Sequence, residues 1–143
     1  MTLGVAVTRL PPLLQELLTK VQSEVAEVRR GACGEIATLR AADRLQLLEA
    51  LVEMLARRAD SPAFVAALEL AERAPDTVQP VCEALMRIPP AAIPVRHAGN
   101  AARLPADNPL VAALLDRWEN STAPGLAPIV RQAREMRQLS GRR

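Results

Sequence analysis

The amino-acid sequence predicts an all-α protein, specifically a right-handed superhelical bundle of about seven helices of the HEAT/ARM type. Apolar residues recur every three or four positions along most of the chain, which is the period of an amphipathic helix. No segment shows the apolar and polar alternation of a half-buried strand. Prolines divide the helical pattern into short pieces, because proline disrupts a helix interior. A stack of helix pairs, each burying one face against its neighbours, is therefore expected.

The first half of the chain predicts two long helices. The first is expected to open at Pro11 and Pro12 and to stop near Gly31. Its apolar face comprises Leu14, Leu17, Leu18, Val21, Val25 and Val28. The second is expected to start at Asp43, which stands three residues before Gln46 as in a capping box. Its buried stripe is predicted to be Leu45, Leu48, Val52 and Leu55.

Two further helices follow between prolines. Ser61 and Pro62 fit the N-cap and first position of a helix, because the N–H that proline lacks has no partner there anyway. Pro75 should end this helix, and Asp76 with Gln79 can cap the next one. The face of the first is predicted to be Phe64, Val65, Leu68 and Ala71. The face of the second is predicted to be Val78, Val81, Cys82, Leu85 and Ile88.

The last part of the chain predicts a connector and two helices. Prolines at 89, 90 and 94 predict an extended connector over residues 89–99 with at most one turn. Asn108 and Pro109 start a helix that contains Leu114, Leu115 and Trp118, and a final helix begins at about Pro128. We expect one core to contain Leu45, Leu48, Val52, Leu55, Leu85, Leu114, Leu115 and Trp118.

Size and charge suggest one helical domain over residues 1–130, followed by a basic helix end and tail over residues 131–143. A chain of 143 residues can bury a core without disulfides or metals. The tail contains one glutamate and five arginines, Arg131, Arg134, Arg137, Arg142 and Arg143. These arginines could contact nucleic acid or an acidic protein segment such as a histone chaperone or histone partner, whereas a solvated helix end explains them equally well.

Few residues suggest chemistry. His97 is the only histidine and has no cysteine or carboxylate at metal-ligand spacing. Spacing alone leaves a Cys33–His97 nucleophile pair open, but a buried thiol is the commoner case. No glycine-rich phosphate loop and no aromatic platform for stacking bases are present. We therefore expect no catalytic residue, no metal and no cofactor. No uncharged run approaches the length of a membrane span, so a soluble, intracellular chain is expected.

Several segments resemble one known family in their order along residues 12–143. Residues 40–48 (RAADRLQLL) are similar to a Pro-Ala-x-x-Lys-Leu-x-Leu-Leu segment, with Arg44 in place of the lysine. Residues 84–89 (ALMRIP) resemble a Leu-x-x-Leu-Pro turn, and residues 108–118 resemble a closing Leu-Trp helix. This order resembles the IWS/SPN transcription elongation factors, whose domain is the TFIIS N-terminal or LW domain. The chain departs from that pattern at residues 70–76 and 98–101, so it would be a divergent member.

The resemblance implies a nuclear protein-interaction module and no enzyme. Its partners would be a short segment of an SPT-type histone chaperone and the RNA polymerase II elongation machinery, with no membrane contact. An unrelated helical scaffold or adaptor subunit of a larger assembly is the alternative. We expect the partner segment to lie between the second long helix and the 78–88 helix. The predicted contact residues are Arg44, Leu48, Arg57, Arg58, Val81 and Arg87.

Overall fold

The computed structural model describes residues 10–141, and this part of the chain is entirely helical apart from its connections. The all-α prediction is confirmed, with eight α-helices within these residues where about seven were expected. The α-helices are α2 (Pro12–Val21), α3 (Ala26–Thr38), α4 (Ala41–Arg57), α5 (Pro62–Arg73), α6 (Val78–Met86), α7 (Val95–Ala98), α8 (Pro109–Glu119) and α9 (Leu126–Gly141). Three short 3-10 segments connect them, η1 (Pro75–Thr77), η2 (Pro90–Ala92) and η3 (Gly99–Arg103).

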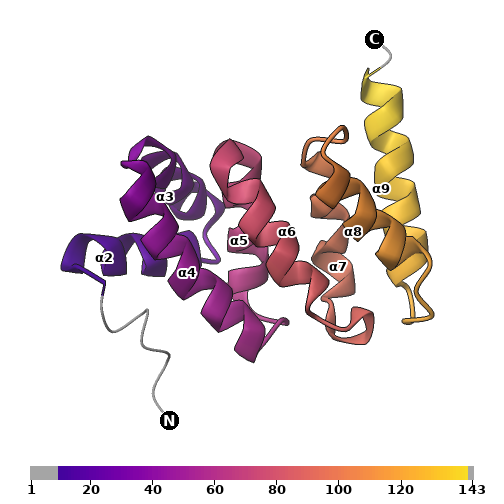
Figure 1. The fold of residues 1–143 in the computed structure, drawn as a ribbon, viewed down its shortest axis with the longest axis horizontal. Helices are drawn as coiled ribbons and strands as arrows, with labels where there is room; N and C mark the ends of the chain where they lie inside the picture. The colour runs from indigo at the N-terminus through magenta and orange to yellow at the C-terminus, as the bar shows by residue number, and fades with distance from the viewer. Residues whose placement is uncertain (1–9, 142–143) are drawn as a thin grey trace.

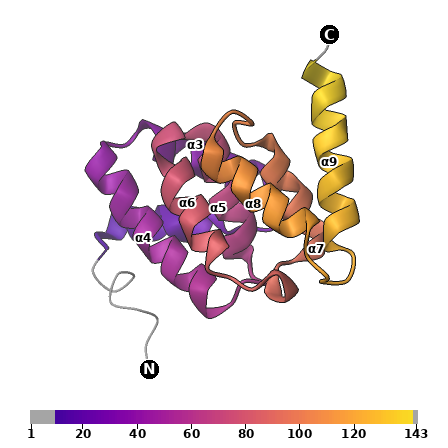
Figure 2. The same ribbon diagram turned by 45° about the vertical axis from the view of Figure 1, so that its right-hand side comes forward.

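The helices follow the long axis of the molecule roughly in chain order (Figure 1). α4, α6 and α8 lie side by side across one face, and α3 and α5 lie behind them (Figures 1 and 2). α9 stands at the far end, where it packs on α8, α7 and η3. The front face of the molecule is therefore built from three helices that are not consecutive in sequence.

The core is centred on α5, whose side chains are buried on almost every side. Its buried residues are Ala63, Phe64, Ala66, Ala67, Leu68, Leu70 and Ala71. Four alanines among them allow the neighbouring helices to approach closely. Phe64 and Trp118 are both fully buried, with ring centroids 6.4 Å apart, within the range for attractive aromatic pairs. This pair connects α5 to α8 and joins the two layers.

The expected first long helix is wrong, because two helices occupy its place. α2 ends at Val21 and α3 begins at Ala26. In the turn between them Gln22 Nε2 donates to the Leu18 carbonyl at 2.9 Å, and Val25 N donates to Ser23 Oγ at 3.1 Å. Such side-chain bonds compete with helical hydrogen bonds. α3 then continues through Gly31, so this glycine does not stop a helix.

The predicted apolar faces are correct for α6 and need correction for α3 and α4. All five residues predicted for this face are buried, although Ile88 lies two positions beyond the end of α6. Val25 and Val28, expected to be buried, are 58% and 41% exposed. On α4, Leu48 and Leu55 are buried as predicted, but Leu45 is 43% exposed and Val52 only partly buried. α4 contains more leucines than one stripe, and Leu47, Leu48, Leu51 and Leu55 are the ones buried where it packs with α2, α5 and α6. The predicted single core holds apart from Leu45 and Val52.

Helix ends also differ in part from expectation. Asn108 caps α8 as predicted, and its Oδ1 accepts a hydrogen bond from Leu110 N at 2.9 Å. Asp43 does not cap α4, which begins earlier, at Ala41. Asp76 does not cap α6, because it lies in η1 and pairs with Arg44. The 89–99 connector is more helical than expected, since it contains η2 and α7. α9 begins two residues before Pro128 and runs across the proposed domain division at residue 130.

Candidate functional site

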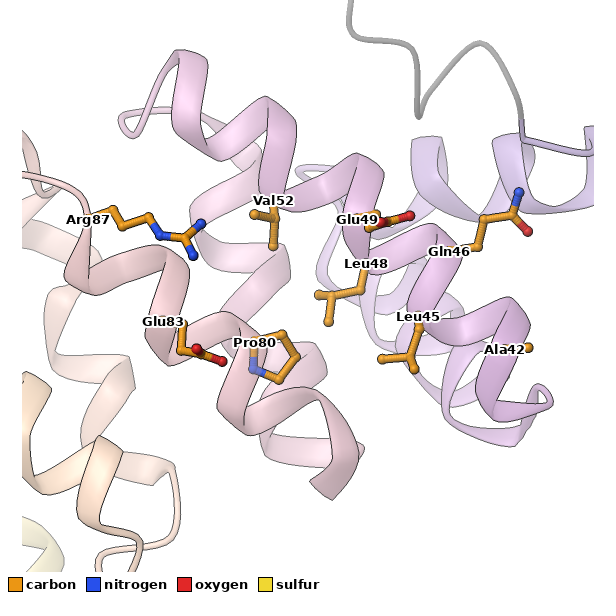
Figure 3. Close-up of a pocket in the computed structure, with 9 residues that line it drawn as sticks. All are labelled: Ala42, Leu45, Gln46, Leu48, Glu49, Val52, Pro80, Glu83 and Arg87. Carbon is orange, nitrogen blue, oxygen red and sulfur yellow. The ribbon is translucent and has the colours of Figure 1, made fainter.

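A groove opens on the front face between α4 and α6 (Figure 3). Its first hollow has a volume of about 510 Å³. The residues lining it are Ala42, Leu45, Gln46, Leu48, Glu49 and Val52 on α4, with Pro80, Glu83 and Arg87 on the α6 side. A second hollow of about 240 Å³ adjoins the first, because Val52 and Arg87 line both. We call the two hollows together the α4–α6 groove.

Helical periodicity places the walls of the groove opposite one another. Leu45, Leu48 and Val52 follow one another at intervals of three and four on α4, so they share a face. Pro80, Glu83 and Arg87 have the same spacing on the α6 side, and proline is tolerated in the first turn of a helix. The two rows of side chains face each other across the first hollow (Figure 3). Sequence spacing was therefore a usable signal for both walls.

The first hollow has a buried apolar floor and a partly solvent-exposed apolar edge. Leu48 is 2% exposed, whereas Leu45 keeps 43% of its surface exposed beside it. A half-exposed leucine next to a hollow is a surface that a second apolar group can cover. This combination of a buried leucine and a half-exposed leucine on one wall makes the hollow a candidate docking site.

The charges of the groove differ between its ends. Glu49 and Glu83 are exposed and lie on opposite walls of the first hollow. Arg87 lies where the two hollows meet, and Arg57 lines the second hollow. The groove therefore carries both signs of charge, with the two glutamates along the first hollow and the arginines toward the second. Neither glutamate was among the contact residues predicted from the sequence.

The predicted contact residues occupy several different positions. Leu48 and Arg87 line the first hollow, and Arg57 lines the second. Val81 is 0% exposed, so it belongs to the core beneath the groove. Arg44 and Arg58 line neither hollow.

Arg44 has a structural position instead. Its Nη2 lies 2.7 Å from Asp76 Oδ2, and its Nη1 donates to the carbonyls of Ala37 and Leu39 at 3.2 and 2.6 Å. It thereby ties α4 to the end of α3 and to η1. The hydrogen bonds from Arg44 lower the pKa of the Asp76 carboxyl below its ordinary value.

Three arginines of the expected basic tail contact the rest of the domain. Arg134 lies 2.8 Å from Asp116 and also pairs with Glu119. Arg131 lies 3.9 Å from Glu119, and Arg137 Nη1 donates to the Ala102 carbonyl at 2.7 Å. These contacts fasten α9 to α8 and η3. The other two tail arginines, at positions 142 and 143, lie outside the described residues.

Burial displaces the pKa values of both thiols and of His97. Burial raises the pKa of the Cys33 thiol to about 12 and that of Cys82 to about 11. A thiol with such a pKa is almost wholly protonated at neutral pH, and the thiolate is the nucleophilic form. Burial also lowers the pKa of His97. Cys33 Sγ lies 3.9 Å from Glu69 Oε2, and the other oxygen of that carboxylate pairs with Arg29 at 2.7 Å.

Residues 10–141 contain no group of three or more histidine, cysteine, aspartate or glutamate side chains placed to hold a metal ion. Within the same range, no helix combines the length and apolarity that crossing a bilayer requires.

Comparison with models of known protein families, with curated proteins and with solved structures found no match to this chain.

Proposed function

We propose that this protein is a docking module whose α4–α6 groove binds a short linear segment of another protein. The observation that carries the proposal is the apolar first hollow with the half-exposed Leu45 at its edge. Grooves between two helices commonly receive amphipathic segments whose anchors recur at helical spacing. A few buried anchors supply most of the binding energy in such complexes.

The charges of the groove define the chemistry of the segment. Glu49 and Glu83 favour a basic residue over the first hollow, and Arg57 and Arg87 favour an acidic residue toward the second. Complementary charges fix the direction of a bound segment and exclude wrong partners. The preferred ligand therefore has apolar anchors, a basic residue over the first hollow and an acidic residue toward the second.

The family resemblance supports a more specific version of this proposal. In this specific version, the chain is a divergent TFIIS N-terminal-type domain of a nuclear elongation factor. Its helices follow a right-handed superhelical course. The bound segment belongs to an SPT-type histone chaperone or to the RNA polymerase II elongation machinery. In this version the role is non-catalytic.

Calorimetric titration with peptides tiled across the N-terminal region of an SPT-type chaperone tests both versions. We expect one peptide to bind and Leu45→Glu to weaken it at least about tenfold, which corresponds to about 1.4 kcal/mol. Leu13→Glu is the matched control, because Leu13 is an exposed leucine on α2, away from the groove. Arg87→Glu should weaken a segment with an acidic end and leave folding intact, since Arg87 is exposed.

Arg44 is unsuitable for this test, because its substitution would remove structural hydrogen bonds. If a peptide binds with an affinity that Leu45→Glu does not change, the groove assignment is wrong. If only peptides unrelated to elongation factors bind, for example from a displayed random library, the groove stands and the elongation-factor version fails.

One observation favours the alternative of a scaffold or adaptor subunit. Leu13, Val25 and Val28 are 60%, 58% and 41% exposed on α2 and at the start of α3. A subunit of a larger assembly would cover such residues at a second contact. Loss of assembly on Val25→Glu, with peptide binding to the groove unchanged, would support this function.

A further inference from the structure

The end of α9 carries an exposed serine. Ser140 lies in the last turn of this helix, and the helix end extends beyond the neighbouring helices (Figures 1 and 2). Among residues 10–141, the Ser140 hydroxyl has no hydrogen-bond partner. The terminal turn of a helix frays and opens at little cost in free energy. Ser140 is therefore available to an enzyme that binds its substrate as an extended segment.

Arginine spacing singles out the same residue. Many serine kinases recognise an arginine three positions before the serine, because the guanidinium enters an acidic pocket of the enzyme. Residues 10–141 contain this spacing twice, at Arg58 with Ser61 and at Arg137 with Ser140. Ser61 is the N-cap of α5, and its Oγ is buried. The fold therefore leaves only Ser140 of these two serines open to modification.

A hollow of about 390 Å³ between η3 and α9 gives Ser140 two cationic neighbours. The residues lining this hollow are Gly99, Asn100, Ala102, Arg103, Ala133, Met136, Arg137 and Ser140. Arg137 Nη1 donates to the Ala102 carbonyl at 2.7 Å, which holds the guanidinium against η3 and leaves its other N–H groups for an anion. The Arg103 side chain has no hydrogen bond or ion pair within the described part of the chain.

The positive charge of this hollow is not neutralised from its own walls. The described residues that line it include no carboxylate. Glu135 is two positions from Arg137, and residues at that spacing do not face each other on a helix. An anionic group carried by Ser140 would therefore meet two guanidinium groups and no like charge on the walls of the hollow.

We propose that Ser140 is a phosphorylation site whose phosphate is bound by Arg103 and Arg137. In the modification, Ser140 Oγ attacks the γ-phosphorus of ATP bound to the kinase. The O–P bond to serine forms, the bond from this phosphorus to the β,γ-bridging oxygen breaks, and ADP leaves. The hydroxyl proton passes to a carboxylate of the kinase. This proposal is independent of the α4–α6 groove.

The two arginines decide how the phosphate affects α9. A phosphoserine carries a charge between about −1.5 and −2 at pH 7. Near the C-terminus of a helix this charge faces the negative end of the helix dipole, so by itself it destabilises the last turn. Charge-assisted hydrogen bonds from Arg103 and Arg137 offset this effect. Phosphorylation should therefore dock the last turn of α9 onto η3.

Treatment of the full chain with ATP, Mg²⁺ and a purified arginine-directed serine kinase tests the modification. Mass spectrometry should place the phosphate on Ser140 and leave Ser61 unmodified. Arg137→Gln should slow the reaction at least about tenfold, because it removes the charge that the kinase recognises. Arg103→Gln lies outside the recognised segment and should not change the rate. A full chain without phosphate on Ser140, or with phosphate on Ser61 instead, would overturn the proposal.

Two measurements on the phosphorylated chain test the role of the arginines. In a ³¹P NMR titration, the second pKa of the phosphoserine, ordinarily about 6, should be lowered, since neighbouring positive charges favour the dianion. Hydrogen exchange of the α9 amides near Ser140 should slow by about threefold or more on phosphorylation, the factor of one exposed ion pair. In Arg103→Gln the pKa should return toward its ordinary value, and phosphorylation should accelerate the exchange.

Arg96→Gln is the matched control, because Arg96 is an exposed arginine on α7 that does not line the hollow. It should behave like the parent chain in both measurements. A phosphoserine pKa that is the same in the parent chain and in Arg103→Gln would overturn the binding of the phosphate by these arginines. Exchange that phosphorylation accelerates in both chains would do the same.

Discussion

Burial differs sharply between neighbouring leucines of α4, and this difference sets what each side chain contributes. Leu48 is 2% exposed and Leu45 is 43% exposed, although they are three residues apart on the same helix. Leu48 belongs to the hydrophobic core and also forms the floor of the first hollow, whereas Leu45 forms the edge of that hollow. One of the pair is thus mainly structural, and the other is available for a partner.

The leucine pair gives the first prediction. Leu48→Ala should lower the free energy of unfolding by about 2–5 kcal/mol, because it removes buried methyl groups and leaves a cavity. Leu45→Ala should lower it by less than about 1 kcal/mol, since a half-exposed side chain loses less contact. Urea denaturation of the two variants beside the unmodified chain measures both. Equal losses for the two variants would contradict the burial described here.

Arg44 shows how a residue that sequence reasoning placed in a binding site can have another role. It makes hydrogen bonds to Asp76 and to the carbonyls of Ala37 and Leu39, so three segments of the chain meet at one guanidinium. Carbonyls at the end of a helix lack helical partners and commonly accept from such a donor. The contact depends on segments 32 residues apart, which no local pattern reveals.

The second prediction concerns the pH dependence of this ion pair. Because the folded-state pKa of Asp76 is lowered, the pair stabilises the protein above the unfolded-state pKa, and the stabilisation is lost as pH falls through the folded-state pKa. Asp76 is 39% exposed, so Asp76→Asn should cost at most about 1 kcal/mol at pH 7. The difference between variant and unmodified chain should vanish in acid.

Thermal unfolding at pH 7 and at a series of lower pH values measures this difference. Asp43→Asn is the control, because its partner Arg40 is 86% exposed and their 3.3 Å contact should contribute little. A cost for Asp76→Asn that stays constant into strong acid would show that the charge is not its source.

At the scale of elements, two glycines have opposite roles. Gly31 lies inside α3, and a Cβ added there would meet nothing within 4 Å. Gly125 precedes α9 with φ of +79°, a conformation that residues with a side chain adopt at a cost. The sequence pattern assigned Gly31 to a helix end, whereas the left-handed turn is at Gly125.

The third prediction follows from these two positions. Gly31→Ala should raise the free energy of unfolding by about 0.5–1 kcal/mol, because alanine loses less conformational freedom in a helix. Gly125→Ala should lower it by about 1–2 kcal/mol, because the left-handed conformation then carries a Cβ. Chemical denaturation of each single variant measures both signs. Stabilisation by Gly125→Ala would show that the turn adopts another conformation in solution.

For the whole molecule, a net charge of +2 and the arginines of the C-terminal segment predict weak binding to nucleic acid. Arg131, Arg134 and Arg137 already contact α8 and η3. We therefore assign the predicted phosphate contacts to the other two arginines of this segment, at positions 142 and 143, from their charge in the sequence. The slope of log affinity against log salt should therefore be no steeper than about −2. Fluorescence anisotropy with a DNA duplex between low and moderate salt measures it.

In the same assay, Arg142→Gln with Arg143→Gln should abolish the salt-dependent binding, and Arg96→Gln serves as a control arginine elsewhere on the surface. Affinity that does not change with salt would remove the idea of phosphate contacts.

Much of the fold could be predicted from local patterns, and the two main failures have different causes. The bounds of α5 and α8 and the buried face of α6 follow from proline positions, one cap and apolar spacing, which act within a few residues. The division between α2 and α3 depends on local side-chain hydrogen bonds of Gln22 and Ser23, which apolar spacing does not reveal. The inward face of α4 depends on its neighbours. A helix with apolar residues on several sides can be turned to bury any of them, and its neighbours decide which.

The candidate site, too, could be predicted in part from local patterns and in part depends on tertiary packing. Spacing predicted a groove wall on α4 that includes Leu48, and a second wall on the 78–88 helix. Only tertiary packing placed Leu45, Glu49 and Glu83 around one hollow. It also buried Val81 in the core and brought Arg44 into contact with Asp76. By itself the sequence determined that the chain is helical and where α5 and α8 begin and end, because these properties depend on neighbouring residues. Tertiary structure decided which side chains face a partner, because that depends on helices brought together from distant parts of the chain.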